Sequence, residues 1–185
     1  MTQPEENRAE PDAFVIQQAQ QGDKSALAQV YDAYARSIYR YHYSRTGNIP
    51  DAEDLTAQTF LAVIEALPRY RSRGHFLAWI FQIARNKAMD HFRKNHKQEA
   101  LSFSLKDLGH AEPLDAIIDQ QVVQRLSHLL GLLNDDEREL ICLRYSAGLS
   151  FVEMAVLLGR KEDAVRKALK RLLERLHNEM EVEIA

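Results

Sequence analysis

Basic and aromatic side chains are interleaved between Arg69 and Lys97, in a pattern typical of surfaces that bind nucleic acid. This stretch has eight Lys or Arg residues and a single acid, Asp90. Its aromatic residues are Tyr70, Phe76, Trp79, Phe81 and Phe92. Unpaired bases stack on such rings while cations follow the phosphate backbone, so the composition favours single-stranded or melted DNA. Phe76 and Phe81 are instead expected in a helical core, and for Tyr70 and Trp79 both interpretations remain open.

A second group of cations lies near the C-terminus, on a helix predicted from about residue 162 to residue 178. Its apolar residues recur at helical spacing and should face a core: Val165, Leu169, Leu172 and Leu176. The opposite face carries Asp163, Lys167, Lys170 and Glu174, with Arg166 and Arg171 on its flanks. Long cationic side chains on such a face reach guanine edges and phosphates in the major groove. A solvated face with i,i+4 charge pairs is the alternative, but it would place Arg166 and Lys170 in a like-charged pair.

Capping residues and glycines define the elements around this helix. Asn134 and Ser150 are each followed three residues later by a glutamate, Glu137 and Glu153, which predicts two capping boxes. Gly148 and Gly159 stand where helices should end in a left-handed residue. The prediction is a helix to about residue 146, a short helix at 151–158, a tight turn and the long helix. This order is the helix-turn-helix pattern.

The first half of the chain is also helical in its periodicity, so the expected fold class is all-α. Asp12 and Asp23 should cap two helices, Asp51 a third that stops at Pro68, and a fourth should span Phe76–Asn95. We expect two small helical domains joined by a linker, the C-terminal one a helix-turn-helix. The predicted parts are an acidic tail at 1–11, an N-terminal domain at 12–97, a linker at 98–119 and a C-terminal domain at 120–185.

Composition limits the other classes of function. No run of about 18 apolar residues is present, and the acidic start is unlike a secretory signal, so we expect a cytoplasmic protein without membrane insertion. The single cysteine, Cys142, lies in an apolar run and is expected to be buried and inert. His91 and His96 do not share a helical face. Glycine-rich phosphate loops, nucleophile elbows and paired catalytic carboxylates are missing, so we expect no enzyme, cofactor or metal.

Three runs of sequence resemble one known family. The first two are Asp51–Leu61 (DAEDLTAQTFL) and Phe76–Asn86 (FLAWIFQIARN). The third is Leu149–Ala155 (LSFVEMA), followed by Leu157–Gly159 and by Val165–Arg166. In this order and spacing they resemble the N-terminal and C-terminal domains of ECF-type bacterial RNA polymerase sigma factors. The resemblance covers about residues 12–97 and 120–178. The turn at residues 159–164 departs from the family, which commonly has a small, uncharged turn and a threonine there.

The resemblance implies roles for particular residues. It assigns the −10 element and DNA melting to Tyr70, Arg71, Arg73, His75, Trp79, Ile83, Asn86, Lys87 and Arg93. It assigns the −35 element to Ser150, Arg160, Lys161, Asp163, Arg166, Lys167, Lys170 and Arg171. It implies that Asp51, Asp54 and Gln58 contact the clamp helices of the polymerase β′ subunit. Helix capping alone would also explain the acidic residues at the start of this helix.

The same resemblance implies partners and leaves two alternatives. The expected partners are core RNA polymerase, through the β′ clamp helices and the β flap, together with promoter DNA and an anti-sigma factor. One alternative is a conventional helix-turn-helix regulator that binds duplex operators as a dimer. The other is a helical adaptor whose basic stretch is only a solvated surface. The aromatic residues between Arg69 and Lys97 favour the sigma factor, because a protein that binds only duplex DNA has little use for base-stacking rings.

Overall fold

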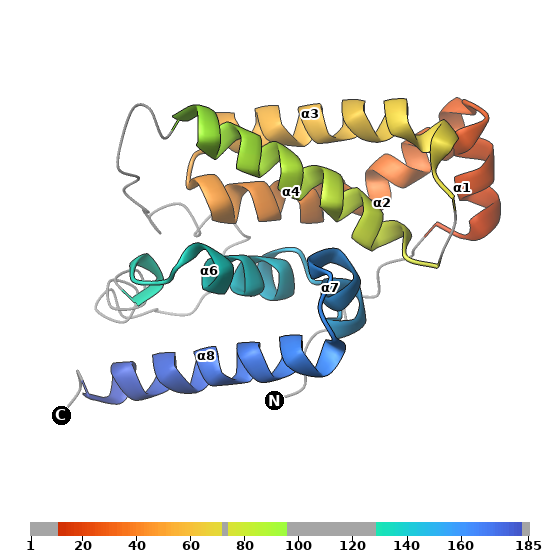
Figure 1. The fold of residues 1–185 in the computed structure, drawn as a ribbon. Helices are drawn as coiled ribbons and strands as arrows, with labels where there is room; N and C mark the ends of the chain where they lie inside the picture. Colours follow the sequence, from red (N-terminus) through yellow and green to blue (C-terminus); the bar gives the residue numbers. More distant parts are fainter. Residues whose placement is uncertain (1–10, 72–73, 96–128, 183–185) are drawn as a thin grey trace, which may run out of the picture.

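All regular secondary structure in the described residues, which are 11–71, 74–95 and 129–182 of a computed structural model, is helical. The N-terminal domain holds α1 (Ala13–Gln20), α2 (Lys24–Thr46), α3 (Ile49–Ala66), the 3-10 turn η1 (Leu67–Arg69) and α4 (Phe76–Asn95) (Figure 1). The C-terminal domain holds α6 (Asp135–Ile141), the π-helical turn η3 (Cys142–Ser146), α7 (Phe151–Leu158) and α8 (Glu162–Val182). The predicted all-α class with two helical domains is confirmed. The predicted linker at 98–119 lies outside the described residues.

Side-chain caps begin the N-terminal helices, with one correction to the sequence prediction. Asp12 and Asp23 accept hydrogen bonds from the backbone N–H groups of Val15 and Ala26, both at 2.8 Å. The third helix begins earlier than predicted, because Asn48 and not Asp51 is its cap. Pro50 therefore lies inside the first helical turn, where its missing N–H leaves no intrahelical bond unmade.

The helix-turn-helix forms at the predicted signals. Both capping boxes, at Asn134 and at Ser150, are complete. The expected left-handed glycines are present, since φ is 74° at Gly148 and 62° at Gly159. Two details differ from the prediction. The helix expected to run to Ser146 changes to π-helical geometry at Cys142, and the last helix extends to Val182.

The two domains share one hydrophobic core. Phe76 and Phe81 lie in it, as predicted, and Phe81 packs edge-on against Tyr41 of α2 with ring centroids 5.7 Å apart. Val165, Leu169, Leu172 and Leu176 bury the inner face of α8. Cys142 is buried as expected, and burial raises the pKa of its thiol to about 11.

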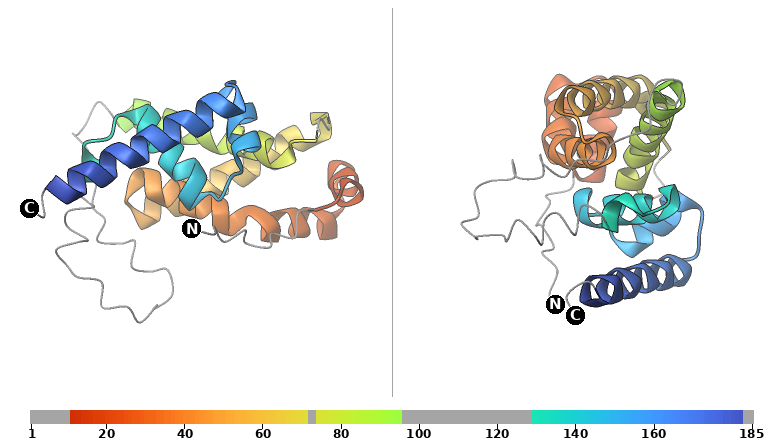
Figure 2. Two further views of the ribbon diagram at one scale, coloured as in Figure 1. Left: turned by 90° about the horizontal axis from the view of Figure 1, so that it is seen from below. Right: turned by 90° about the vertical axis from the view of Figure 1, so that its left-hand side faces the viewer.

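The C-terminal helices lie against α2 and α4. Contacts join α2 to η3 and α4 to α7, and α8 is the helix farthest from the N-terminal domain (Figure 2). None of the helices within the described ranges has the length and apolar character needed to cross a membrane. This arrangement decides which faces of α4 and α8 remain free to meet another molecule.

Candidate nucleic-acid interface

A cluster of three aromatic rings lies where η1 leads into α4. The ring centroid of Tyr70 is 4.6 Å from that of Trp79 and 5.1 Å from that of Phe76, and Phe76 stacks on Trp79 at 5.5 Å. Phe76 is buried, whereas Tyr70 and Trp79 are half-buried. Both rings pack against the hydrophobic core, but neither side chain is fully buried. That a base stacks on Tyr70 or Trp79 stays a prediction.

Gln20 of α1 fixes the backbone that carries Tyr70. Its side-chain amide donates to the carbonyl oxygens of Leu67 at 3.2 Å and of Tyr70 at 2.6 Å. These two bonds tie residues about fifty positions apart in sequence to one another. Sequence reasoning missed this residue, because a glutamine inside a short amphipathic helix carries no local signal of such a contact.

The other predicted −10 residues follow α4 and its preceding loop. Asn86, Arg71 and Arg93 are exposed, while His75, Ile83 and Lys87 are half-buried. The Asn86 side-chain oxygen accepts from Gln82 at 3.1 Å, and Arg93 pairs with Asp90 at 2.9 Å. Arg73 lies outside the described residues. The described side chains from η1 to the end of α4 thus combine rings, cations and an amide, the groups that hold unstacked bases and their phosphates.

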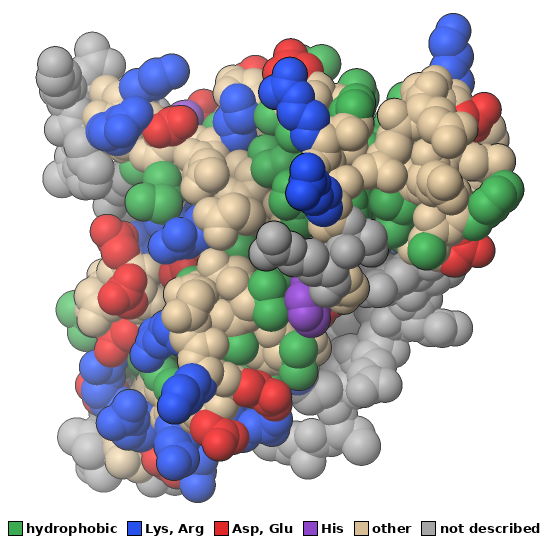
Figure 3. Space-filling view, turned by 45° about the vertical axis from the view of Figure 1, so that its right-hand side comes forward, with side chains coloured by type: hydrophobic (Ala, Val, Ile, Leu, Met, Phe, Trp, Pro, Cys, Tyr) green, Lys and Arg blue, Asp and Glu red, His purple; other side chains and the backbone are tan. Residues whose placement is uncertain are grey.

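The predicted −35 residues lie on the outer surface of the helix-turn-helix. Arg160, Lys161, Asp163, Arg166, Lys167, Lys170 and Arg171 are all exposed. Lys and Arg side chains gather over α8 in the space-filling view (Figure 3). Ser150 is also exposed, but its hydroxyl already accepts from the Glu153 N–H at 3.2 Å as the α7 cap.

The expected repulsion between Arg166 and Lys170 is not what the structure shows. Arg166 pairs with Glu162 at 2.5 Å, and Lys170 pairs with Glu174 at 3.5 Å. The guanidinium of Arg166 also lies 4.5 Å from the centre of the Phe151 ring. Each cation has an acidic neighbour one turn away. Repulsion between Arg166 and Lys170 is therefore no argument against the alternative that this face of α8 is only solvated. The case for DNA binding by α8 depends instead on its position as the second helix of the motif.

Lys167→Ala distinguishes these two interpretations of α8. Lys167 is exposed near the middle of the outer face. If it contacts a phosphate, the substitution is expected to flatten the log–log salt dependence of DNA binding by about 0.9. The measurement is fluorescence anisotropy on promoter duplex at several salt concentrations. Lys24→Ala, which removes an exposed cation from α2, is the matched control, and equal slopes for both variants would identify the α8 face as merely solvated.

A separate exposed surface lies on α3. Asp54 accepts from the side chain of Gln58 at 2.6 Å, and both residues are exposed, while Asp51 faces His91 of α4 at 3.7 Å. Leu61 lies one further turn along and is 63% exposed. Sequence reasoning left Leu61 out, although its spacing of three from Gln58 and seven from Asp54 puts all three on one face. This polar and apolar stripe suits a protein partner better than DNA.

The fold and these surfaces define a class: an all-helical, two-domain DNA-binding protein with a C-terminal helix-turn-helix. Comparison with known proteins gives the family. The family described as Sigma-70 region 2 matches residues 30–98, and the family described as Sigma-70, region 4 matches residues 123–176. The ECF RNA polymerase sigma factor SigD of Mycobacterium tuberculosis is 34% identical over 174 residues, which are 90% of this chain and 82% of SigD. The chain belongs to the ECF RNA polymerase sigma factors.

Two further relatives set the extent of the similarity. The ECF RNA polymerase sigma factor BldN of Streptomyces coelicolor is 33% identical over 156 residues, and the match spans 82% of this chain but only 59% of BldN. The solved structure of CnrH in complex with the cytosolic domain of CnrY superposes with a TM-score of 0.68. It is 24% identical and covers 91% of this chain and 96% of CnrH, which supports the fold.

Proposed function

We propose that the chain joins core RNA polymerase, recognises the −10 and −35 elements of a promoter and promotes DNA melting. The observation that carries this proposal is the pairing of two surfaces in a sigma-factor fold. One is the ring cluster of Tyr70, Phe76 and Trp79, which suits unpaired bases, and the other is the basic outer face of α8, which suits a major groove. On this proposal the bond-making chemistry of transcription would belong to the polymerase, and the protein would act with it in the cytoplasm.

Each surface takes one part of this function. The η1–α4 surface would hold bases extruded from the −10 element, and stacking and hydrogen bonds there must offset an unstacking cost of about a few kcal/mol. Residues of α7 and α8 would contact the −35 element. The α3 stripe of Asp54, Gln58 and Leu61 would dock on the β′ clamp helices, and the C-terminal domain on the β flap. Because CnrH was solved with the cytosolic domain of CnrY, a second, inhibitory protein of the anti-sigma kind is a further proposed partner.

Run-off transcription with purified core polymerase tests the proposal. The protein is expected to direct initiation at defined start sites on native promoters, and core polymerase alone is not. The alternative of a conventional duplex-binding regulator is disfavoured by the family membership. It would be revived by a protein that binds duplex operators tightly alone, as a dimer, and never supports initiation. The adaptor alternative would be supported by a protein that neither binds DNA nor directs initiation.

Gln20→Leu tests whether the backbone of Tyr70 must be held in place for melting. The change keeps the side-chain size and helix propensity but removes the donor to two carbonyl oxygens. We expect open-complex formation to fall about three- to tenfold, from the loss of hydrogen bonds that each contribute about 1 kcal/mol. Permanganate footprinting of unpaired thymines measures the melting.

Two controls accompany this variant. Gln17→Leu, on the exposed side of the same helix, should behave as the unsubstituted protein. Binding of Gln20→Leu to core polymerase should also stay unchanged, because α1 contributes nothing to the α3 stripe. If Gln20→Leu loses polymerase binding to the same extent as melting, Gln20 only stabilises the domain and has no separate role in melting.

A further inference from the structure

Two arginine side chains lie over one aromatic ring in the C-terminal domain. The guanidinium carbon of Arg166 is 4.5 Å from the centre of the Phe151 ring, and that of Arg144 is 4.8 Å from it. Both distances are within the roughly 6 Å over which a cation is attracted to the face of a ring. The three residues come from α8, α7 and η3. The ring therefore connects both helices of the helix-turn-helix with the helical turn that precedes them.

The Phe151 ring is held in place from the side of the protein. Arg144 donates from Nη1 to the carbonyl oxygen of Leu149 at 2.7 Å, which fixes the backbone two residues before Phe151. Phe151 is the first residue of α7, directly after the Ser150 cap, and its half-buried side chain packs against the hydrophobic core. A ring at the start of a capped helix and against a core has little freedom to turn. It can therefore support a longer and more flexible side chain.

Arg166 is held by two contacts although it lies on the surface. Its Nη2 donates to the carboxylate of Glu162, one helical turn earlier, at 2.5 Å, and its guanidinium lies over the Phe151 ring. The side chain of Arg166 is still 55% exposed. An unrestrained surface arginine samples many rotamers, and ordering them opposes binding. Two contacts that select one arrangement before DNA is bound remove part of that cost.

These contacts leave Arg166 able to bind another molecule. Attraction to the face of a ring uses the positive charge of the guanidinium and none of its hydrogen-bond donors. Within the described residues, the hydrogen bond to Glu162 uses Nη2 alone. The remaining N–H groups of the planar fork can donate to the O6 and N7 atoms of guanine, the two acceptors that this base presents in a major groove.

The same arrangement gives a role to Glu162, which lies in the turn that departs from the family. A carboxylate next to DNA repels phosphates unless a cation balances its charge. Arg166 supplies that cation, and in return Glu162 directs the guanidinium across the Phe151 ring. The acidic residue therefore need not weaken DNA binding at this position.

We propose that Phe151 is a positioning residue for −35 recognition, which with Glu162 holds the guanidinium of Arg166 ready to donate to one guanine of the −35 element. The DNA step rests on the proposed function, but the held position of Arg166 is a property of the free protein. The effect of Phe151 passes through Arg166 and so reaches one base pair. A residue that only stabilises the domain would affect every base pair alike.

The position of Arg166 is tested in the free protein, without DNA. An aromatic ring shifts the nuclear magnetic resonance signals of groups that lie over its face. The Nε–H signal of Arg166, assigned by its loss in Arg166→Lys, should therefore move when Phe151→Leu removes the ring, and the side chain should gain motion on the nanosecond timescale. Phe151→Tyr keeps the ring and should change neither. An Arg166 signal that does not respond to Phe151→Leu would overturn the held position.

The guanine contact is tested by base discrimination. With the chain bound to core polymerase, each G·C pair of the −35 element is replaced by A·T, and binding of the duplex is measured by fluorescence anisotropy. One replacement should weaken binding about five- to a hundredfold, the usual loss at a guanine held by a paired arginine contact. Arg166→Ala should abolish this discrimination, and Phe151→Leu should reduce it about three- to tenfold because Arg166 is no longer held. If no G·C pair depends on Arg166, the guanine contact is wrong.

The double variant separates positioning from plain stability. If Phe151 acts through Arg166, Phe151→Leu has no further effect on discrimination once Arg166→Ala is present. Phe151→Tyr should keep the discrimination of the unsubstituted chain. An equal effect of Phe151→Leu with and without Arg166, or an equal effect on every base pair, would overturn the positioning role.

Glu162→Gln is a second variant, at a residue that is not part of the hydrophobic core. It should reduce discrimination at the same base pair and raise the affinity for an unrelated duplex, because a charge that repels phosphates is lost. Raised affinity with unchanged discrimination would show that Glu162 does not hold Arg166. A chain that never directs initiation, yet shows the ring-shifted Arg166 signal, would refute the proposed function and the guanine contact but not the held position of Arg166.

Discussion

Tyr70→Ala is expected to reduce promoter opening by about ten- to a hundredfold, the effect of removing one base-stacking ring worth about 1–3 kcal/mol. The Tyr70 side chain is half-buried and its ring packs against Trp79 and Phe76. Its loss therefore removes a ring on which a base could stack and also a packing contact that holds Trp79 in place. Binding to a fully paired −35 duplex should not change, because we propose that α8 makes that contact. Stopped-flow fluorescence of a 2-aminopurine base in the −10 element measures the opening rate.

Tyr70→Phe is the matched variant. The Tyr70 hydroxyl is buried without a hydrogen-bond partner, so its removal relieves an unsatisfied polar group and leaves the ring in place. Phenylalanine should therefore keep the opening rate and slightly raise the free energy of unfolding. If phenylalanine is as defective as alanine, the hydroxyl and not the ring face contacts the DNA, and the stacking role is wrong.

Leu169→Ala is expected to lower the free energy of unfolding by about 2–5 kcal/mol, the usual cost of a cavity at a fully buried leucine. Leu169 is 2% exposed and lies at the centre of the apolar face that seats α8. Because the C-terminal domain is small, this loss should abolish −35 binding near physiological temperature while melting of a −10 fragment persists. Urea unfolding followed by circular dichroism gives the free energy.

Leu173→Ala provides the same chemical change on the same helix. Its side chain is 37% exposed, so we expect a cost below about 1 kcal/mol. If both variants lost a similar free energy of unfolding, the face that carries Leu169 would not be the one that packs α8 against the core. The assigned orientation of the cations on the outer surface of α8 would then be wrong.

Local signals were enough to place most of the helices. Caps such as Asp12, Asp23 and Ser150 act on backbone groups two or three residues away, so the sequence alone contains the whole interaction. The exception was α3, because both Asn48 and Asp51 have side chains that can cap a helix. The prediction chose Asp51 and so began the helix three residues too late. The π-helical turn at Cys142–Ser146 has no such local signature.

The exposed residues of the candidate site were also predictable, because the apolar stripe of α8 fixes which residues point outward. Contacts between distant segments were not. Gln20 reaches a carbonyl fifty residues away, and Glu139 meets Tyr41 at a separation of 98 residues. Neither the residue types nor their spacing in the sequence predicts such contacts, because they depend on how distant segments pack. Arg166 was misjudged for a related reason: its position favoured repulsion from Lys170, while its actual partners are Glu162 and the Phe151 ring.

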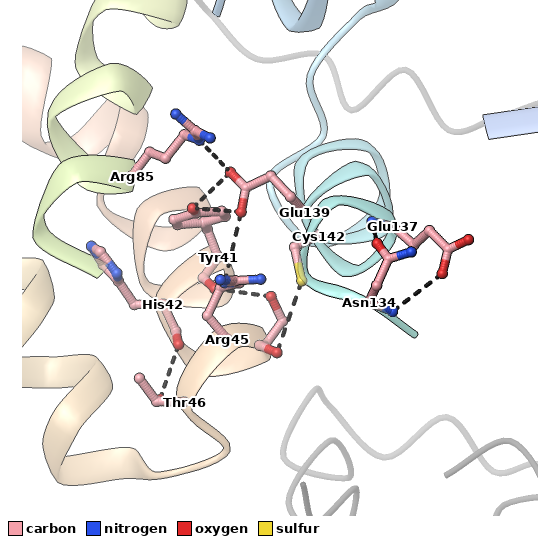
Figure 4. A network of polar contacts seen from close by, with 10 residues as sticks. Tyr41, His42, Arg45, Thr46, Arg85, Asn134, Glu137, Glu139 and Cys142 are labelled. Carbon is pink, nitrogen blue, oxygen red and sulfur yellow. Dashed lines mark hydrogen bonds and ion pairs between the residues drawn. The ribbon is translucent and has the colours of Figure 1, made fainter. Parts of the chain in front are cut away.

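The short helix α6 has one further consequence. Glu137 pairs with Arg175 of α8 at 2.9 Å, and Glu139, two residues on, points to the N-terminal domain. Two residues turn a helix by about 200°, so these glutamates project from opposite sides of a single stiff rod (Figure 4). The Glu137–Arg175 pair and the shared apolar core together hold α8 against α6. If α8 contacts a major groove, as we propose, it would reach the groove already oriented, with little conformational entropy left to lose on contact.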